Sequence, residues 1–123
     1  MSTKHISTQK NIIKNQPGFF LWAEKDDVQV GNTVFISGTD FDLVLDKFEA
    51  EFPLANPLYQ TVETHFDHCA HNYFDRQTCQ RIVDNLAQIK SESQMNDDFI
   101  QELVLWLKEQ LKCADNIVIE GNL

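Results

Sequence analysis

The densest group of side chains that could do chemistry lies between His65 and His71. This segment, HFDHCAH, holds three of the chain's four histidines together with Asp67 and Cys69. Imidazole, thiolate and carboxylate are the ligands that zinc takes in tetrahedral protein sites. A cysteine beside a histidine could instead act as a nucleophile with its base. The segment therefore defines one candidate function, a small metal- or thiol-dependent enzyme.

The spacing of these residues does not favour a metal. On a helix, each three-residue step from His65 to His68 to His71 would rotate the side-chain direction by about 300°, so the three side chains would fan out. On a strand, His68 would point away from the other two. Structural zinc usually joins two ligand pairs that are distant in the sequence, and the sequence offers no second pair. Cys69 directly follows His68, which turns their side chains in different directions.

The predicted role of these histidines is therefore local hydrogen bonding near a helix that begins at Asp75. The sequence contains no nucleotide-binding loop, no hydrolase nucleophile motif and no H-E-x-x-H pair. We predict no catalytic residue, no metal and no cofactor, and keep the enzyme centred on His65, His68, Cys69 and His71 as the alternative.

Charge is the stronger signal. The chain has 123 residues, with 19 Asp and Glu against 10 Lys and Arg, and a net charge of −9. Such a chain is a poor ligand for nucleic acid or for an anionic membrane, which both need clustered basic side chains. It favours a basic protein partner, because complementary charge steers association. An acidic adaptor whose charge serves only solubility is the blander interpretation.

The carboxylates gather in two blocks. Residues 24–51 hold eight acids and two lysines, and residues 91–123 hold seven acids and two lysines. A helix predicted to end before Pro53 carries acids on both sides of its apolar stripe. A second helix near the end of the chain carries acids around an outward-facing leucine. These two helices supply the predicted partner-binding residues, which are Asp42, Asp46, Glu49, Glu51, Glu102, Leu105 and Glu109.

The first half of the chain predicts strands followed by a helix. Residues 19–23 form an aromatic run typical of a strand buried on both faces, and residues 24–27 form a polar turn. Residues 28–36 are either a hairpin turning at Gly31-Asn32 or one long kinked strand. Ser37 then has the sequence of an N-cap, and apolar residues at helical spacing predict a helix from Phe41 to Phe52.

The second half predicts a strand, two helices and a closing strand. Residues 58–66 alternate enough for a strand. Asp75 is a predicted N-cap, and Asn96 is predicted to cap a last helix over about 97–113. A final strand is predicted over 116–121. The helix after Asp75 carries an apolar stripe of Cys79, Ile82, Val83, Leu86 and Ile89.

Together these elements predict an α+β fold, with a small antiparallel sheet of N-terminal strands and a C-terminal strand packed on about three helices. Length and composition predict a single domain over 1–123. Residues 1–15 stay open as a loosely ordered leader, a strand or a short helix. The odd set of three cysteines, without a secretory signal or a long apolar run, predicts a cytoplasmic protein with free thiols.

In overall profile the chain resembles the small acidic immunity proteins of bacterial toxin–immunity systems, including those of contact-dependent growth inhibition. The shared features are small size, acidity, many aromatic residues and the lack of a catalytic motif. The resemblance implies a stoichiometric inhibitor that binds a cognate basic toxin, often a nuclease domain. Its carboxylates would replace nucleic-acid phosphates against the toxin's Lys and Arg side chains. No motif carries individual residues over from those families.

Overall fold

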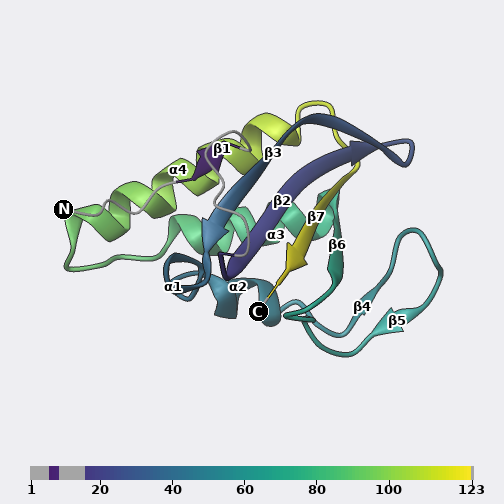
Figure 1. Ribbon diagram of the computed structural model, residues 1–123, viewed down its shortest axis with the longest axis horizontal. Coiled ribbons are helices and arrows are strands. Elements are labelled where there is room, and N and C mark those ends of the chain that lie inside the picture. Colours follow the sequence, from purple (N-terminus) through teal and green to yellow (C-terminus); the bar gives the residue numbers. More distant parts are fainter. Residues whose placement is uncertain (1–5, 9–15, 123) are drawn as a thin grey trace.

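The fold is organised by an antiparallel sheet whose last strand lies between strands from distant parts of the chain (Figure 1). The computed structural model describes residues 6–8 and 16–122. Within them, the strands form a five-stranded sheet in the order β1-β3-β2-β7-β6 and a two-stranded sheet of β4 and β5. The α+β class and the joining of N-terminal and C-terminal strands are therefore confirmed.

The elements follow one another along the chain as β1 (Ser7–Thr8), β2 (Gly18–Lys25), β3 (Val28–Ser37), α1 (Gly38–Phe41), α2 (Leu45–Glu49), β4 (Leu54–Ala55), β5 (Val62–Glu63), β6 (His71–Asp75), α3 (Arg76–Ala87), α4 (Gln94–Gln110) and β7 (Asn116–Gly121). Of the segment left open as a leader, Ser7 and Thr8 pair with β3, and residues 1–5 and 9–15 lie outside the described part of the chain.

Helices α3 and α4 cover one face of the sheet, which we call the inner face (Figure 1). Alternate residues of β2 and β7 point toward the helices because side chains alternate along a strand. They meet the apolar stripes of both helices in one buried cluster. The strand residues at its centre, all inaccessible to solvent, are Phe19, Leu21, Ala23, Ile117 and Ile119.

The hairpin between β2 and β3 turns at Asp26 and Asp27. Both have positive φ, 52° and 64°, which a two-residue hairpin turn needs and which aspartate tolerates better than most residues. The polar turn predicted over residues 24–27 is confirmed at Asp26 and Asp27, whereas Glu24 and Lys25 belong to β2. The kinked strand is the correct alternative for residues 28–36. Gly31, at φ 75°, lies where the register between Leu21 and Ala23 shifts, so it marks a bulge inside β3.

The prediction that residues 19–23 are buried on both faces is wrong. Helices cover one face of β2, whereas Phe20 and Trp22 on the other face remain partly exposed. Phe35 of β3 nevertheless packs its ring against Phe20, with ring centroids 5.1 Å apart, and lies over Gly18. We call this second side the open face of the sheet.

The predicted continuous helix from Phe41 to Phe52 is also wrong, because it is split into α1 and α2 by a turn at residues 42–44. In this turn the amides of Leu43 and Val44 bond to the carbonyls of residues three positions earlier, so the backbone tightens. Tertiary packing outweighs the local helix pattern. The split lets Phe41 pack on Phe19, with ring centroids 4.4 Å apart, while Phe48 packs on Phe74.

The predicted strand over residues 58–66 is wrong except at Val62–Glu63, which pair with Leu54–Ala55 as a short separate sheet. Most of this stretch forms an arm beside β6 (Figure 1). The strand that joins the main sheet instead is β6, at residues 71–75, and the sequence analysis missed it.

The two long helices begin at side-chain caps. The Asp75 carboxylate accepts a hydrogen bond from the amide of Thr78 at 2.8 Å, as predicted. The helix predicted to begin after Asn96 begins earlier, at Gln94, because the Ser93 hydroxyl is the group that accepts from the Asn96 amide. The predicted stripe of α3 is buried from Cys79 to Leu86. None of the described helices is long and apolar enough to cross a membrane.

Removing the Asp75 cap tests how far α3 supports the fold. We expect Asp75→Ala to lower the free energy of unfolding by about 1 kcal/mol, because the Thr78 amide loses its acceptor. Asp75→Asn is the control, since its amide oxygen caps nearly as well. Urea unfolding of both variants measures the difference, and equal losses would contradict a capping role.

Candidate functional site

The candidate site lies on the open face, where the strand register lines up side chains from three strands. In one row Trp22 of β2, Val118 of β7 and Tyr73 of β6 are direct neighbours, and in the next Glu120 of β7 stands opposite His71 of β6. Val118 is inaccessible to solvent although the described helices α3 and α4 pack on the opposite face, which fits its place between two large aromatic residues. The rows therefore form a continuous aromatic and acidic surface.

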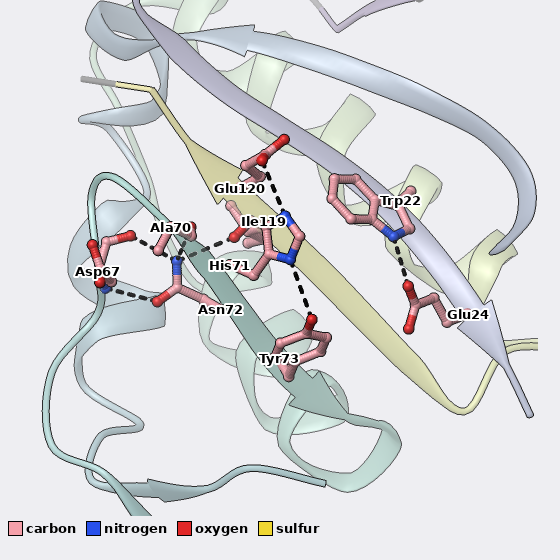
Figure 2. Close-up of polar contacts among 9 residues, drawn as sticks. All are labelled: Trp22, Glu24, Asp67, Ala70, His71, Asn72, Tyr73, Ile119 and Glu120. Atoms are coloured by element: carbon pink, nitrogen blue, oxygen red, sulfur yellow. Dashed lines mark hydrogen bonds and ion pairs between the residues drawn. The ribbon is translucent and has the colours of Figure 1, made fainter. Parts of the chain in front are cut away.

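A hydrogen-bonded chain connects Tyr73, His71 and Glu120 (Figure 2). His71 Nε2 lies 3.0 Å from Glu120 Oε2, and His71 Nδ1 lies 3.2 Å from the Tyr73 hydroxyl. An ionised carboxylate only accepts hydrogen bonds, so Nε2 donates to Glu120. In the neutral imidazole Nδ1 then accepts from Tyr73. This chain orients all three side chains.

Tyr73 is held in its neutral form. Partial burial raises the pKa of its hydroxyl above the usual value, and neighbouring Tyr59, Glu24 and Glu120 raise the pKa further. The Tyr73 hydroxyl therefore stays protonated and can donate a hydrogen bond to His71 Nδ1. Trp22 lies next to His71 on the open face, with the two ring centroids 5.4 Å apart. Its indole NH donates a hydrogen bond to Glu24 at 2.9 Å (Figure 2).

Asn72 points the opposite way from His71 and fastens the loop before β6 (Figure 2). Its side-chain oxygen accepts from the Asp67 amide at 2.7 Å, and its side-chain nitrogen donates to three carbonyls. These belong to Asp67, Ala70 and Ile119 of β7. The Asn72 side chain thus positions the 67–70 loop against the sheet.

A cleft of about 510 Å³ opens between this part of the sheet and the arm that carries β4 and β5. The sheet side contributes His71, Tyr73 and Glu120, and the arm and the loop contribute Tyr59, Glu63, His65 and Asp67. The cleft brings three carboxylates and two tyrosines together. Such a lining suits a cation with flat or apolar surfaces.

In the part of the chain that the structure describes, the three histidines that suggested an enzyme do not share a hydrogen-bonding partner, although His65 and His71 both line the cleft. His65 bonds to the Thr64 hydroxyl at 2.8 Å, His68 lies 3.7 Å from Glu49, and His71 bonds to Glu120 and Tyr73. Among the described residues no group of three or more His, Cys, Asp or Glu side chains is placed to hold a metal ion. The described structure therefore brings His65 and His71 to one cleft but does not bring all three histidines together.

The cysteines differ in accessibility. Cys69 and Cys113 are exposed, whereas Cys79 is buried in the α3 stripe, where its thiol donates to the Phe74 carbonyl. Burial raises the pKa of Cys79 to about 12, and the nearby Asp75 carboxylate adds to the increase. Cys79 thus stays protonated and behaves as a small apolar residue.

The predicted acids of the first block lie at the surface around α1 and α2, and they differ in what they contact. Asp42 and Asp46 are exposed, and Asp46 lies 3.7 Å from Lys47. Glu49 faces His68. The Glu51 side chain is only 12% exposed and forms an ion pair with Arg81 at 2.9 Å, so its charge is largely used within the fold.

The predicted residues of α4 form a second, separate group. Glu102 accepts from the Ile6 amide at 2.8 Å, and Glu109 pairs with Lys112 at 2.8 Å. Leu105 is 59% exposed, as its helical position predicted. Since α3 packs against both α2 and α4, it separates the α4 group from the acids around α2.

Sequence reasoning missed Trp22, Tyr59, Tyr73 and Glu120 as members of a site. The local sequence offered little signal for β6, because Asn72 is a polar residue at a buried position and so breaks the polar–apolar alternation of a half-buried strand. The pairing of Glu120 with His71 spans 49 positions, so no local pattern could predict it.

Comparison with known proteins gives no match, whether with protein-family models, curated proteins or solved structures.

Asn72 offers a direct test of how the site is positioned. We expect Asn72→Ala to lower the free energy of unfolding by about 2–4 kcal/mol, because it leaves several backbone groups without their partner. Asn72→Asp should cost at least as much, since a carboxylate cannot donate to the three carbonyls. Asn85→Ala, on the exposed side of α3, serves as the control, and urea unfolding measures all three. A loss no greater than the control's would mean that the network does not hold the loop.

The thiols should react in two classes. At about pH 8 Cys69 and Cys113 should react rapidly with a disulfide reagent, whereas Cys79 should react only as the protein unfolds, because its raised pKa and burial leave almost no accessible thiolate. Counting the thiols released with time measures both classes, and Cys79→Ser should remove the slow class alone. Equal rates for all three thiols would contradict the burial of Cys79.

Proposed function

We propose that this protein is a stoichiometric inhibitor that binds a basic protein partner through its acidic surface. By its resemblance to immunity proteins, the partner would be a cognate toxin in the bacterial cytoplasm, and a nuclease domain is the class that best fits the charge. The proposal involves no turnover of substrate. One observation carries it, namely that exposed carboxylates among the described residues outnumber the Lys and Arg side chains that pair with them there.

The ion pairs of the described residues show the size of this excess. In the part of the chain that the structure describes, Lys or Arg side chains pair with Asp46, Glu51 and Glu109, and the sequence as a whole has 19 acidic against 10 basic side chains. Self-repulsion from a net charge of −9 disfavours the compact state. A basic partner would relieve that repulsion on binding and would be drawn to the surface by it.

The acids near α2 and the cleft support a single interface. Glu49 lies 3.7 Å from His68, and His68 belongs to the same 65–70 loop whose His65 and Asp67 line the cleft. A partner that covers this loop can meet Asp42, Asp46 and Glu49 on one side and the cleft on the other. The α4 group, with Glu102, Leu105 and Glu109, lies beyond α3 and is the less favoured surface.

The open face adds aromatic side chains that can contribute binding energy beyond electrostatic attraction. Trp22 and Tyr73 are half-buried and held by hydrogen bonds, so binding would cost little side-chain entropy. Tryptophan and tyrosine are the residues that most often dominate binding energy at protein interfaces. In this mechanism carboxylates steer the encounter, aromatic residues hold the complex, and the occupied basic surface of the toxin no longer accepts nucleic acid.

Charge reversal at α1–α2 tests the proposal. We expect Asp42, Asp46 and Glu49 changed together to Lys to slow association with the basic protein encoded by the adjacent gene by about tenfold or more, because the steering field reverses locally. Stopped-flow or biosensor kinetics at low salt measure the rate. Inhibition of the partner's activity at one-to-one stoichiometry is the second expected result.

The control is a variant with the same change in net charge elsewhere. Asp84, Glu92 and Asp98 are exposed, and changing all three to Lys should slow association much less. Equal slowing by both variants would remove the α1–α2 surface from the interface. If the neighbouring basic protein forms no complex and keeps its activity, the inhibitor proposal is overturned in favour of the acidic adaptor.

A further inference from the structure

The cleft between the arm and the open face has a lining of one charge sign. Its acidic side chains are Glu63, Asp67 and Glu120, and its described lining contains no Lys or Arg. His65 and His71 are the other titratable groups besides the tyrosines, and each already has a hydrogen-bonding partner, His65 in Thr64 and His71 in Glu120 and Tyr73. A cationic group is therefore the ligand that complements this cleft.

The tyrosines of the cleft favour a planar cation over a compact one. Tyr59 and Tyr73 lie edge to face, with ring centroids 6.1 Å apart and planes at 81°, so one tyrosine presents a ring face close to the other's edge. Tyr59 is 66% exposed, which leaves its ring accessible from the cleft. A planar guanidinium stacks on such rings and is weakly hydrated, whereas an ammonium is compact and strongly hydrated.

Glu120 supplies an oriented acceptor for that cation. His71 uses part of the hydrogen-bonding capacity of the carboxylate at Oε2, and an ionised carboxylate has about four acceptor positions. Because His71 is itself held by Tyr73, Glu120 is fixed from the side of the sheet. A fixed carboxylate beside aromatic rings matches the fork of donors and the flat faces of an arginine side chain.

We propose that this cleft binds an arginine side chain of the protein partner. The guanidinium pairs with Glu120 and stacks against Tyr59 and Tyr73, while Glu63 and Asp67 add negative potential at the rim. The volume of about 510 Å³ exceeds what one arginine side chain needs, so neighbouring residues of the partner can enter with it. The identity of the occupant as part of a protein rests on the proposed inhibitor function, whereas the chemistry of the cleft can be tested alone.

A short peptide is a suitable probe. The ¹⁵N-labelled protein is titrated with acetyl-Gly-Arg-Gly-amide, with the same peptide carrying lysine, and with the same peptide carrying citrulline, which keeps the shape of arginine without its charge. At about 0.15 M salt, where distant charges are screened, we expect the arginine peptide to bind about tenfold or more tightly than the citrulline peptide and about threefold or more tightly than the lysine peptide. The shifted signals should be the Trp22 indole and the amides of Tyr59, His71 and Tyr73.

Two variants tie the binding to the cleft. Glu120→Gln and Tyr59→Ala should each weaken the arginine peptide by about fivefold or more, because one loses the charged acceptor and the other the stacking surface. Both positions are at least partly exposed, so the fold should survive. Glu92→Gln, an exposed carboxylate outside the cleft, should leave binding unchanged. Equal binding of all three peptides, or equal weakening by Glu92→Gln, would overturn the proposal.

The same variants separate this proposal from the inhibitor function. If the complex with the basic partner forms and Glu120→Gln leaves its affinity unchanged, arginine capture in the cleft is wrong and the inhibitor function stands. If the arginine peptide binds in the cleft but no complex with the neighbouring basic protein forms, the cleft chemistry stands and the inhibitor function is wrong.

Discussion

The constraint on which the rest of the structure depends is the position of β7 between β2 and β6. This strand closes the sheet across almost the whole chain, pairing Phe19 with Gly121. It buries Ile117 and Ile119 beneath α3 and α4 and at the same time places Glu120 beside His71. A side chain at Gly121 would collide with the carbonyl of His68, so the absence of a side chain there lets the 65–70 loop approach the sheet. The core, the 65–70 loop and the candidate site therefore all depend on the position of β7.

Local sequence patterns predicted the parts of the fold that local physics decides. The Asp75 cap, the stripe of α3, the turn at Asp26-Asp27 and the closing strand each follow from a few neighbouring residues. The wrong predictions concern elements whose form depends on distant contacts. Phe41 and Phe48 have a helical spacing, but Phe41 packs on Phe19 and Phe48 on Phe74, and the helix is divided between them. β6 is defined by pairing with β7, and the histidines, grouped in sequence, turn to partners as distant as Glu49 and Glu120.

The distribution of charged residues in the sequence predicted the site incompletely, because contacts between distant residues also decide which carboxylates are available. Asp42 and Glu51 look equivalent in the sequence, but Asp42 is exposed, whereas the side chain of Glu51 is largely covered. Arg81 of α3, thirty positions away in the sequence, forms an ion pair with Glu51. Glu102 is likewise engaged by the Ile6 amide. Conversely, Glu120 falls in the second acidic block but lies in a short apolar strand, and its environment comes from β6. Whether a carboxylate is available to a partner depends on which cation the fold brings to it.

The two walls of the cleft differ in how firmly the fold holds them. On the sheet side, a one-residue slip of β7 would exchange Ile119 with Glu120 between the two faces, and so would expose the core and dismantle the site together. The register that protects the core thus also fixes His71, Tyr73 and Glu120. On the arm side, β4 and β5 have two residues each and Tyr59 is exposed, so few buried contacts oppose local adjustment. The sheet side of the cleft, with Tyr73 and Glu120, is therefore held by the same register as the core, whereas the arm side, with Tyr59 and Glu63, can adjust without disturbing that core.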